Sequence, residues 1–573
     1  MNGLPMPRTA AAWESRTPTR KKAPAHRSMA QAGPLAMPVS DRPAEPRSRA
    51  VLQAVFGWLR SIPVEAILVG LGLFAVLAIF VAADPPSNAT YSQAPFTDEA
   101  FNVVNSRNLV QLGQWSTDQW TRQFVELPFS LLEAATFQLI GVGIVQARLP
   151  MILCVSLTAS ALVWGLRDLV GRSCAIFAGL AFAGSGLILL YGRLVFFEDL
   201  VVLGLTLGTL VLVREGRLTL RGGLLSGACY ATAIGTKPNA AFAVLGILVA
   251  VGAAWGWRDR GIRRWLAGTG LVVCISGLGW AVFIWLPNQA AVAIDFATWP
   301  ALQFALTPQA LLESVRLYLQ GGSDDVVGSL LGPLLAFAAL GVVAIIVLRG
   351  RLSGTEARLA VAAGGWAVFG FGILLIVSYR PNRYAVPLVP ALAILAAIGL
   401  HVGGGWLAER LESRRAVAGR ADGDRSADRS VAAAIAQTQN PRGSSLGKRR
   451  AIPLLAALAV LIAVAPGLRL YGSWAGSATY NLVSIQDRFA SLVPAGERVA
   501  GRDAALFLMK SPAITIIVGL ANNGDLYAEG VRMYLVLDGD PVPTGVPAGA
   551  WAARQSIACA DWNSVSECLV RVP

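Results

Sequence analysis

Charged residues are scarce in this sequence: Asp, Glu, Lys and Arg make up 14% of its 573 residues, while 55% are hydrophobic. An ordinary soluble domain carries about 25% charged residues. This composition therefore excludes an ordinary soluble protein. Apolar runs of about 20 residues, the length of a membrane-spanning helix, recur along the chain. The shortage of charge and the apolar runs together predict an α-helical polytopic membrane protein.

Histidine is also scarce, since only His26 and His401 occur. A metal site built from several histidines is therefore excluded. The sequence has no Walker A motif, no Rossmann glycine pattern and no Cys-x-x-Cys. No resident cofactor is expected from these residues, and a divalent cation is the one candidate left open.

The six cysteines are unevenly placed. Cys559 and Cys568 lie nine positions apart in a polar region near the end of the chain. If that region lies outside the cytoplasm, a disulfide between them is expected. The other four lie in or beside apolar runs and are expected to be inert packing residues: Cys154, Cys174, Cys229 and Cys274.

The net charge of +14 could indicate a nucleic-acid partner, but the basic residues lie mostly beside apolar runs. That arrangement is typical of the positive-inside rule for membrane proteins, so no nucleic-acid partner is expected. Residues 1–61 are basic and rich in Pro and Ala, which predicts a disordered cytoplasmic tail.

Eleven spanning helices are predicted. Their basic connections fall on one side, the cytoplasm, together with the tail and a charged, disordered loop at 407–450. The opposite side holds the first loop, 84–146, and everything after the last span. The predicted spans are 62–83, 147–166, 173–191, 199–214, 222–236, 239–256, 265–286, 327–348, 359–378, 385–406 and 451–470.

The segment Pro128–Val145 is apolar enough to suggest a further span. Counting it would move the basic connection Arg167–Arg172 to the outside and invert every later loop. The segment also contains Glu133 and Gln138. We therefore predict an amphipathic helix that lies on the outer membrane surface.

Residues 471–573 differ in composition from the spans. Strand-like runs at Ala513–Val518 and Arg532–Leu537 alternate with turn signals, and Asp503–Met509 is helix-like. The pattern predicts a small extracytoplasmic α/β domain after the span 451–470.

The first loop carries the most informative motif, Thr97-Asp98-Glu99, at the start of a helix-like segment just after a span. In one interpretation, Asp98 or Thr97 caps the helix and Glu99 favours its N-terminal dipole. In the other, one carboxylate acts as general base on an acceptor hydroxyl or amine at the membrane surface.

These residues resemble the glycosyltransferase C (GT-C) superfamily, within it the branch of protein O-mannosyltransferases and lipid A aminoarabinose transferases. The resemblance covers residues 62–406 and rests on several short motifs in the order expected for that family. They are Asp98-Glu-Ala, Gly113-Gln-Trp115, Gln146-Ala-Arg-Leu-Pro150, Tyr191-Gly-Arg-Leu-Val-Phe-Phe-Glu-Asp199, Gly235-Thr-Lys-Pro238 and Arg383-Tyr-Ala-Val-Pro387.

The resemblance implies roles for individual residues. Asp98 matches the catalytic aspartate, with Glu99 beside it. Glu126 matches a glutamate near the donor site, where the aminoarabinose branch often has a lysine next and this chain has Leu127. The remaining residues expected to bind the donor or its phosphate are Arg193, Glu198, Asp199, Lys237, Arg380 and Arg383.

Several of these residues also have a purely structural interpretation. Glu198 and Asp199 are also suited to cap the following span. Lys237 and Arg383 lie at ends of spans, where basic side chains commonly reach toward lipid headgroups. A lipid-phosphate donor needs cations at the same depth, because phosphate charge grows as the sugar leaves.

The function implied by the resemblance is sugar transfer from a polyprenyl-phosphate donor to a protein, lipid or cell-envelope glycan. We expect it at the outer face of the plasma membrane, in contact with membrane lipids. One alternative is a lipid or solute transporter or flippase, which would place charges at mid-span. Another is a non-catalytic scaffold, which would not depend on Asp98.

Overall fold

The computed structural model describes most of the chain after residue 61. The described residues are 62–85, 96, 98–115, 126–214, 218–255, 259–290, 292–293, 304, 306–320, 326–378, 381–423, 445–517, 525–537, 539–562 and 565–573. The predicted basic tail and Arg380 lie outside them.

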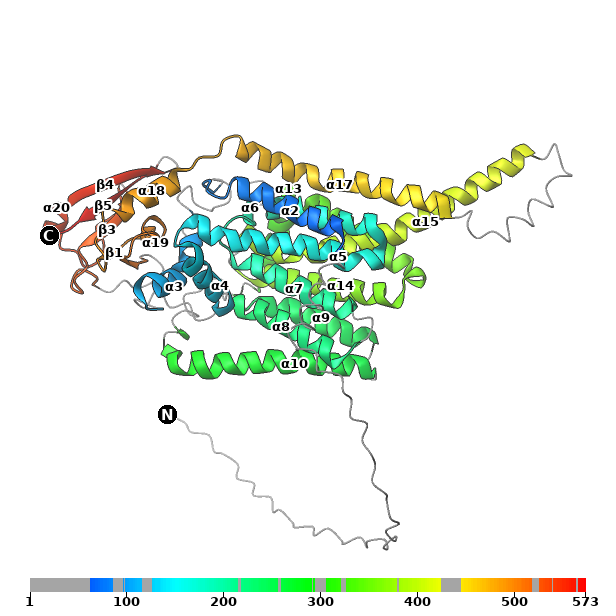
Figure 1. The fold of residues 1–573 in the computed structure, drawn as a ribbon, viewed down its shortest axis with the longest axis horizontal. Helices are drawn as coiled ribbons and strands as arrows, with labels where there is room; N and C mark the ends of the chain where they lie inside the picture. The colour runs from blue at the N-terminus through cyan, green and yellow to red at the C-terminus, as the bar shows by residue number, and fades with distance from the viewer. Residues whose placement is uncertain are drawn as a thin grey trace, which may run out of the picture. The chain divides into compact units, whose positions relative to one another are not determined.

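Helices make up most of the described structure (Figure 1). They are α2 (Val64–Ile79), α3 (Asp98–Leu112), α4 (Leu127–Ile140), α5 (Ile144–Ala183), α6 (Gly186–Tyr191), α7 (Phe197–Arg214), α8 (Leu220–Thr236), α9 (Ala240–Trp255), α10 (Arg260–Trp280), η2 (Ala281–Trp285), η3 (Leu286–Asn288), α12 (Pro308–Gln320), α13 (Val326–Val347), η5 (Arg349–Arg351), α14 (Gly354–Ile376), η6 (Asn382–Leu388), α15 (Val389–Gly423), α17 (Ser445–Ala475), α18 (Asn481–Ala490), α19 (Ala504–Phe507) and α20 (Ala548–Ala552).

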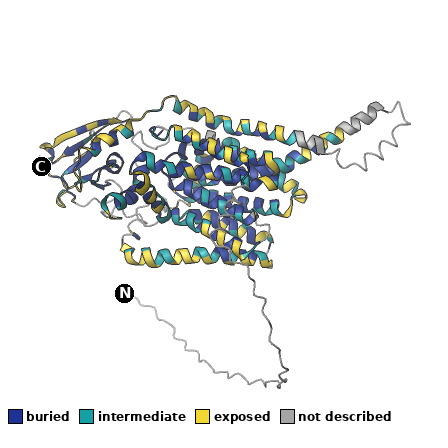
Figure 2. Cartoon of the chain, viewed as in Figure 1, coloured by how far each residue is buried: buried dark blue, intermediate teal, exposed yellow. Residues whose placement is uncertain are grey.

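Five of the described helices are long and apolar enough to cross a membrane. Shorter apolar helices, such as α2 and α9, accompany them, so the count of eleven spans stays a prediction. In the view of Figure 2, α5 and α15 are mostly buried, whereas α10 and α17 present long exposed faces. The exposed side chains of α10 are apolar, as expected for a lipid-facing helix. They include Leu271, Ile275 and Leu278.

Helix α5 is broken where the sequence predicts a connection. The predicted basic connection is Arg167–Arg172, and Gly171 inside it has a φ of 78° and a ψ of 161°, which are not helical values. Glycine tolerates this positive φ without a Cβ clash. Glu65 of α2 pairs with Arg167 at 3.1 Å and with Arg172 at 3.2 Å, one on each side of the break.

Two regions differ from prediction. Helix α15 continues to Gly423 and helix α17 begins at Ser445, so both ends of the predicted loop 407–450 are helical. Residues 424–444 lie outside the described part of the chain. Helix α12 lies between the predicted spans 265–286 and 327–348, where the sequence predicts no helix.

Helix α4 lies where the sequence predicts a surface helix. Its 14 residues extend about 21 Å, which is too short for a bilayer core of about 30 Å. One face buries Phe129, Glu133 and Phe137, while Leu131 and Leu139 are exposed. Both faces are therefore largely apolar, so the predicted amphipathic pattern is not found, and the place of α4 at the membrane surface stays a prediction.

The last part of the chain forms a five-stranded sheet of order β2-β1-β3-β5-β4. Strands β1 (Arg498–Ala500), β2 (Ile514–Ile516) and β3 (Met533–Leu537) are parallel, whereas β4 (Gln555–Trp562) and β5 (Val565–Arg571) complete it as an antiparallel hairpin. We call residues 481–573, with α18 to α20, the C-terminal region. The predicted small α/β fold is confirmed, including β2, β3 and α19 near their predicted positions.

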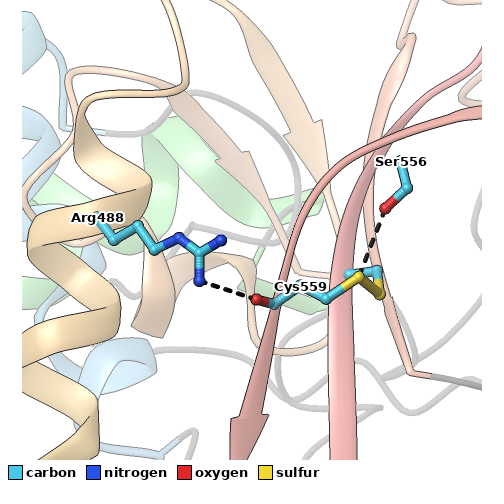
Figure 3. Close-up of a disulfide and its surroundings, with 4 residues drawn as sticks. Arg488, Ser556 and Cys559 are labelled. Carbon is cyan, nitrogen blue, oxygen red and sulfur yellow. Dashed lines mark hydrogen bonds between the residues drawn. A yellow bond between two sulfur atoms is a disulfide. The ribbon is translucent and has the colours of Figure 1, made fainter.

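The predicted disulfide is present in this sheet. Cys559 of β4 and Cys568 of β5 are directly paired residues of the hairpin, and their sulfurs are bonded (Figure 3). Arg488 of α18 donates a hydrogen bond of 3.1 Å to the carbonyl oxygen of Cys559, which ties the helix to the edge strand.

Candidate functional site

Asp98 and Arg383 form an ion pair. Asp98 begins helix α3, where the helix dipole favours a negative charge. Arg383, in η6, places Nη2 2.6 Å from Asp98 Oδ2. The Asp98 side chain is 36% exposed and that of Arg383 12% exposed, so a substrate can reach the pair.

Lys237 and Glu198 form a second, buried ion pair. Lys237 ends α8, and Glu198 lies in the first turn of α7. The Lys237 ammonium also lies 3.8 Å from the centre of the Tyr384 ring, which is a favourable cation–π distance. Glu126 and Arg383 are close enough to act on Lys237 electrostatically.

Tyr384 joins the two pairs into one cluster. Its ring centre lies 5.6 Å from the guanidinium carbon of Arg383, and Lys237 contacts the same ring. Phe196 and Phe96 also lie close to Arg383, at 5.3 and 5.8 Å. The cluster thus holds two cations, with carboxylates beside each, against aromatic rings.

Glu99, predicted beside Asp98 as a catalytic carboxylate, is fully buried and already engaged. Both oxygens accept hydrogen bonds from Arg148, at 2.8 and 2.6 Å, and one also accepts the backbone N–H of Val195. Arg148 in turn donates to the carbonyl oxygens of Val81 and Ala83. This geometry suits a residue that fixes α3 to α5.

Arg193, predicted to bind phosphate, is also turned inward. Its guanidinium donates to the carbonyl oxygens of Ala83 and Asp84, each at 2.8 Å, and lies 4.1 Å from the Trp474 ring centre. The side chain is buried. Arg193 therefore ties the segment between α6 and α7 to the residues that follow α2.

Two buried acids stand out behind the cluster. Among the described residues, neither carboxyl oxygen of Asp199 or of Glu133 has a hydrogen-bond partner. Both lie close enough to Cys154 to act on it electrostatically. Burial raises the pKa of Glu133, on helix α4, well above its ordinary value.

A metal site is not formed by the described side chains. No group of three or more His, Cys, Asp and Glu among them is arranged to hold a metal ion. Arg380, predicted as a phosphate contact, lies outside the described residues.

The chain was compared with known proteins. No family model and no curated protein matches it. Two solved structures of ArnT from Cupriavidus metallidurans, the lipid A aminoarabinose transferase, do match. The apo form is 18% identical with a TM-score of 0.56, and the form bound to undecaprenyl phosphate is 19% identical with a TM-score of 0.54. Each alignment covers 90% of this chain and 98% of that chain.

The chain has the GT-C fold. The fold class expected from the short motifs is thereby confirmed, since the likeness extends over nearly the whole of both chains. Together with the apolar helices, it makes the chain a multi-pass membrane protein.

Sequence reasoning missed three residues that build this site. Arg148 is the partner of Glu99, and Tyr384 is the ring between the cations. Both residues lie inside the short motifs of the sequence, but a motif does not show which distant side chain each residue contacts. The third is Arg107, which the sequence marks as the one basic residue of helix α3.

Proposed function

We propose that this protein is a glycosyltransferase that moves a sugar from a polyprenyl-phosphate donor to an acceptor hydroxyl or amine. The observation that carries the proposal is the reachable Asp98–Arg383 pair beside the Lys237–Tyr384 contact. A carboxylate able to accept a proton thus lies next to two cations able to hold a phosphate. The fold, shared with ArnT bound to undecaprenyl phosphate, supports the same donor class.

The proposed reaction is a direct displacement at the anomeric carbon. The acceptor O–H or N–H gives its proton to the Asp98 carboxylate, and the acceptor atom forms the new bond to the sugar. The bond between the anomeric carbon and the phosphate oxygen breaks, and polyprenyl phosphate leaves with the electron pair. Arg383 and Lys237 stabilise the charge that grows on the leaving phosphate.

The ion pair adds a step before chemistry. Arg383 is occupied by Asp98 in this structure. A donor phosphate that binds Arg383 competes with Asp98 for the guanidinium, and a released Asp98 is a freer proton acceptor. Glu198 and Glu126 then hold Lys237 in place, while Asp199 remains a proposed acidic neighbour of the donor.

The membrane orientation follows from the same proposal. We place Asp98 and the C-terminal region at the outer face of the plasma membrane, and the tail and the loop 407–450 in the cytoplasm. A lipid-linked sugar facing outward suits that side. The proposed catalytic module is 62–406. The C-terminal domain, predicted from residue 471, begins only after α17 ends at Ala475.

The decisive experiment is sugar transfer by purified protein in lipid nanodiscs, with Asp98→Asn beside wild type. Asn has the size of Asp, caps a helix about as well and keeps a hydrogen-bonding oxygen, so the variant loses the base together with the negative charge that pairs with Arg383. We expect turnover to fall by about 10²–10⁴-fold with donor binding retained. Glu529→Gln, which changes an exposed acid that pairs with Arg498, is the control and should retain activity.

Normal transfer by Asp98→Asn would remove Asp98 from the mechanism. Absence of transfer by wild type across a panel of polyprenyl-phosphate sugars would contradict the proposal. The transporter alternative would then be tested by reconstituting the purified protein into vesicles and measuring lipid translocation across their membrane.

A further inference from the structure

Arg107, on helix α3, inserts its side chain into the C-terminal region. Its guanidinium is buried and donates to backbone carbonyl oxygens of residues 508–513, which we call the carbonyl loop. The hydrogen bonds run to Met509 at 3.0 Å, Leu508 at 3.2 Å, Ala513 at 2.7 Å and Ser511. Burial lowers the pKa of Arg107 to about 10, so it is still charged at neutral pH.

The rest of α3 is held as firmly. Gln111, one turn further along, donates to the carbonyl oxygen of Lys510 at 3.3 Å. Val103 and Val104 share one buried hydrophobic cluster with Leu482 and Phe489 of α18 and with residues 504–509. Helix α3 is therefore packed between the membrane bundle and the C-terminal region.

A second connection joins the same two parts. The carboxylate of Asp84, just after α2, accepts the backbone N–H groups of Asn481 and Leu482 at 2.9 and 3.0 Å and the hydroxyl of Thr479. Asp84 thus caps the N-terminus of α18 from far away in the sequence. The C-terminal region is therefore held at two points of the first loop, at Asp84 and at α3.

The mechanical consequence concerns Asp98. Asp98 and Arg107 lie nine residues apart on one helix, which is about 13 Å along its axis. A helix is stiff over that length, so holding Arg107 also fixes where the Asp98 carboxylate can be. A displacement of about 1 Å at a catalytic group can cost about 10²-fold in rate.

We propose that Arg107 is a positioning residue, through which the C-terminal region holds Asp98 in line with Arg383. The inference rests on the proposed function, because it assigns the C-terminal region a role in that reaction. The region is then a working part of the active site. Deleting or loosening it should reduce chemistry more than donor binding.

The test is Arg107→Gln in purified full-length protein, with Arg488→Gln as the matched control. Arg488 also donates to a backbone carbonyl of the C-terminal region, but it contacts Cys559 and not α3 (Figure 3). We expect Arg107→Gln to lower kcat by about 10- to 100-fold. Its Kd for undecaprenyl phosphate and the activity of Arg488→Gln should stay within about twofold of wild type.

A rescue separates positioning from folding. Cysteines at Gln111 and Lys510, in a Cys274→Ser background, would allow a short bifunctional thiol reagent to link α3 to the carbonyl loop. Cross-linking should restore most of the kcat of Arg107→Gln. If Arg107→Gln fails to fold, Arg107→Lys keeps the buried charge, and its point-like ammonium should still give a smaller kcat defect that the link repairs.

Hydrogen exchange gives a readout independent of activity. Arg107→Gln should speed exchange of the amides in α3, and Arg488→Gln should not. Unchanged α3 exchange, a wild-type kcat or failure of the link to restore kcat would each overturn the inference. Inactive wild type would contradict the proposed function alone, and α3 exchange would still decide whether Arg107 holds the helix.

Discussion

The buried and half-buried cations of this protein divide into two kinds. Arg107, Arg148 and Arg193 direct their guanidinium groups at backbone carbonyls, and Arg148 also binds Glu99. Most of their donors are used within the protein, the exception among the described atoms being the buried Nε of Arg193. Lys237 and Arg383 instead form ion pairs with carboxylates and contact aromatic rings. These are contacts that a phosphate could replace or join, so the proposal assigns donor binding to the second kind alone, although Arg148 and Arg193 also lie near ends of predicted spans.

Lys237→Met should weaken donor binding, because a charge-assisted hydrogen bond to phosphate contributes about 1.5–3 kcal/mol. We expect Kd for the lipid donor to rise by about 10- to 100-fold. The single variant also leaves the Glu198 charge buried without its ion-pair partner, at a cost of about 3–5 kcal/mol in stability. Lys237→Met with Glu198→Gln removes that cost, so the double variant should fold like wild type and still bind donor weakly, as measured by lipid-donor titration. Wild-type donor affinity in the double variant would show that Lys237 serves packing only.

At the scale of elements, the β5 strand and the turn before α19 meet at two buried acids. Burial raises the pKa of both Asp503 and Glu567. The neighbouring Asp503 raises the pKa of Glu567 further, to about 10, whereas the interaction with Glu567 lowers that of Asp503. Arg502 approaches Asp503 at 3.7 Å, and Asp540 adds a further negative charge. The folded state therefore binds a proton that the unfolded chain releases near pH 4.5. Stability from this pair is present at acid pH and falls as pH rises above that value.

Glu567→Gln should flatten this pH dependence, because an amide keeps the shape without a proton to lose. The measurement is the temperature at which protease begins to cleave the C-terminal strands of purified protein, at about pH 6 and about pH 9. Wild type should lose more of its resistance at the higher pH than Glu567→Gln. Glu529→Gln changes an exposed carboxylate and should behave like wild type. Equal pH dependence in wild type and Glu567→Gln would mean that the pair does not hold a proton.

At the scale of the molecule, apolar runs predicted the bundle well, because helices such as α9 and α14 are single apolar segments between polar ones. They also predicted the connection Arg167–Arg172, inside which α5 breaks at Gly171. Strands β1, β4 and β5 were not predicted, whereas β2, as short as β1, lies within the longer apolar run Ala513–Val518. The site was predicted residue by residue, from motifs. Its pairings depend on contacts between distant segments, such as Asp98 with Arg383, and local pattern carries no information about them.

Topology is the prediction on which the whole arrangement depends. The fold fixes which helices are adjacent, and the basic connections decide which side faces the cytoplasm. Single cysteines at Ser92, in the first loop, and at Ser430, in the loop 407–450, lie on opposite sides in the proposed orientation. In intact cells of a Cys274→Ser background, a membrane-impermeant maleimide should label the cysteine at 92 and leave the one at 430 unlabelled until the cells are opened. Labelling of both from outside would contradict the span count, and labelling of 430 alone would invert the protein and place Asp98 where a lipid-linked sugar facing outward cannot reach it.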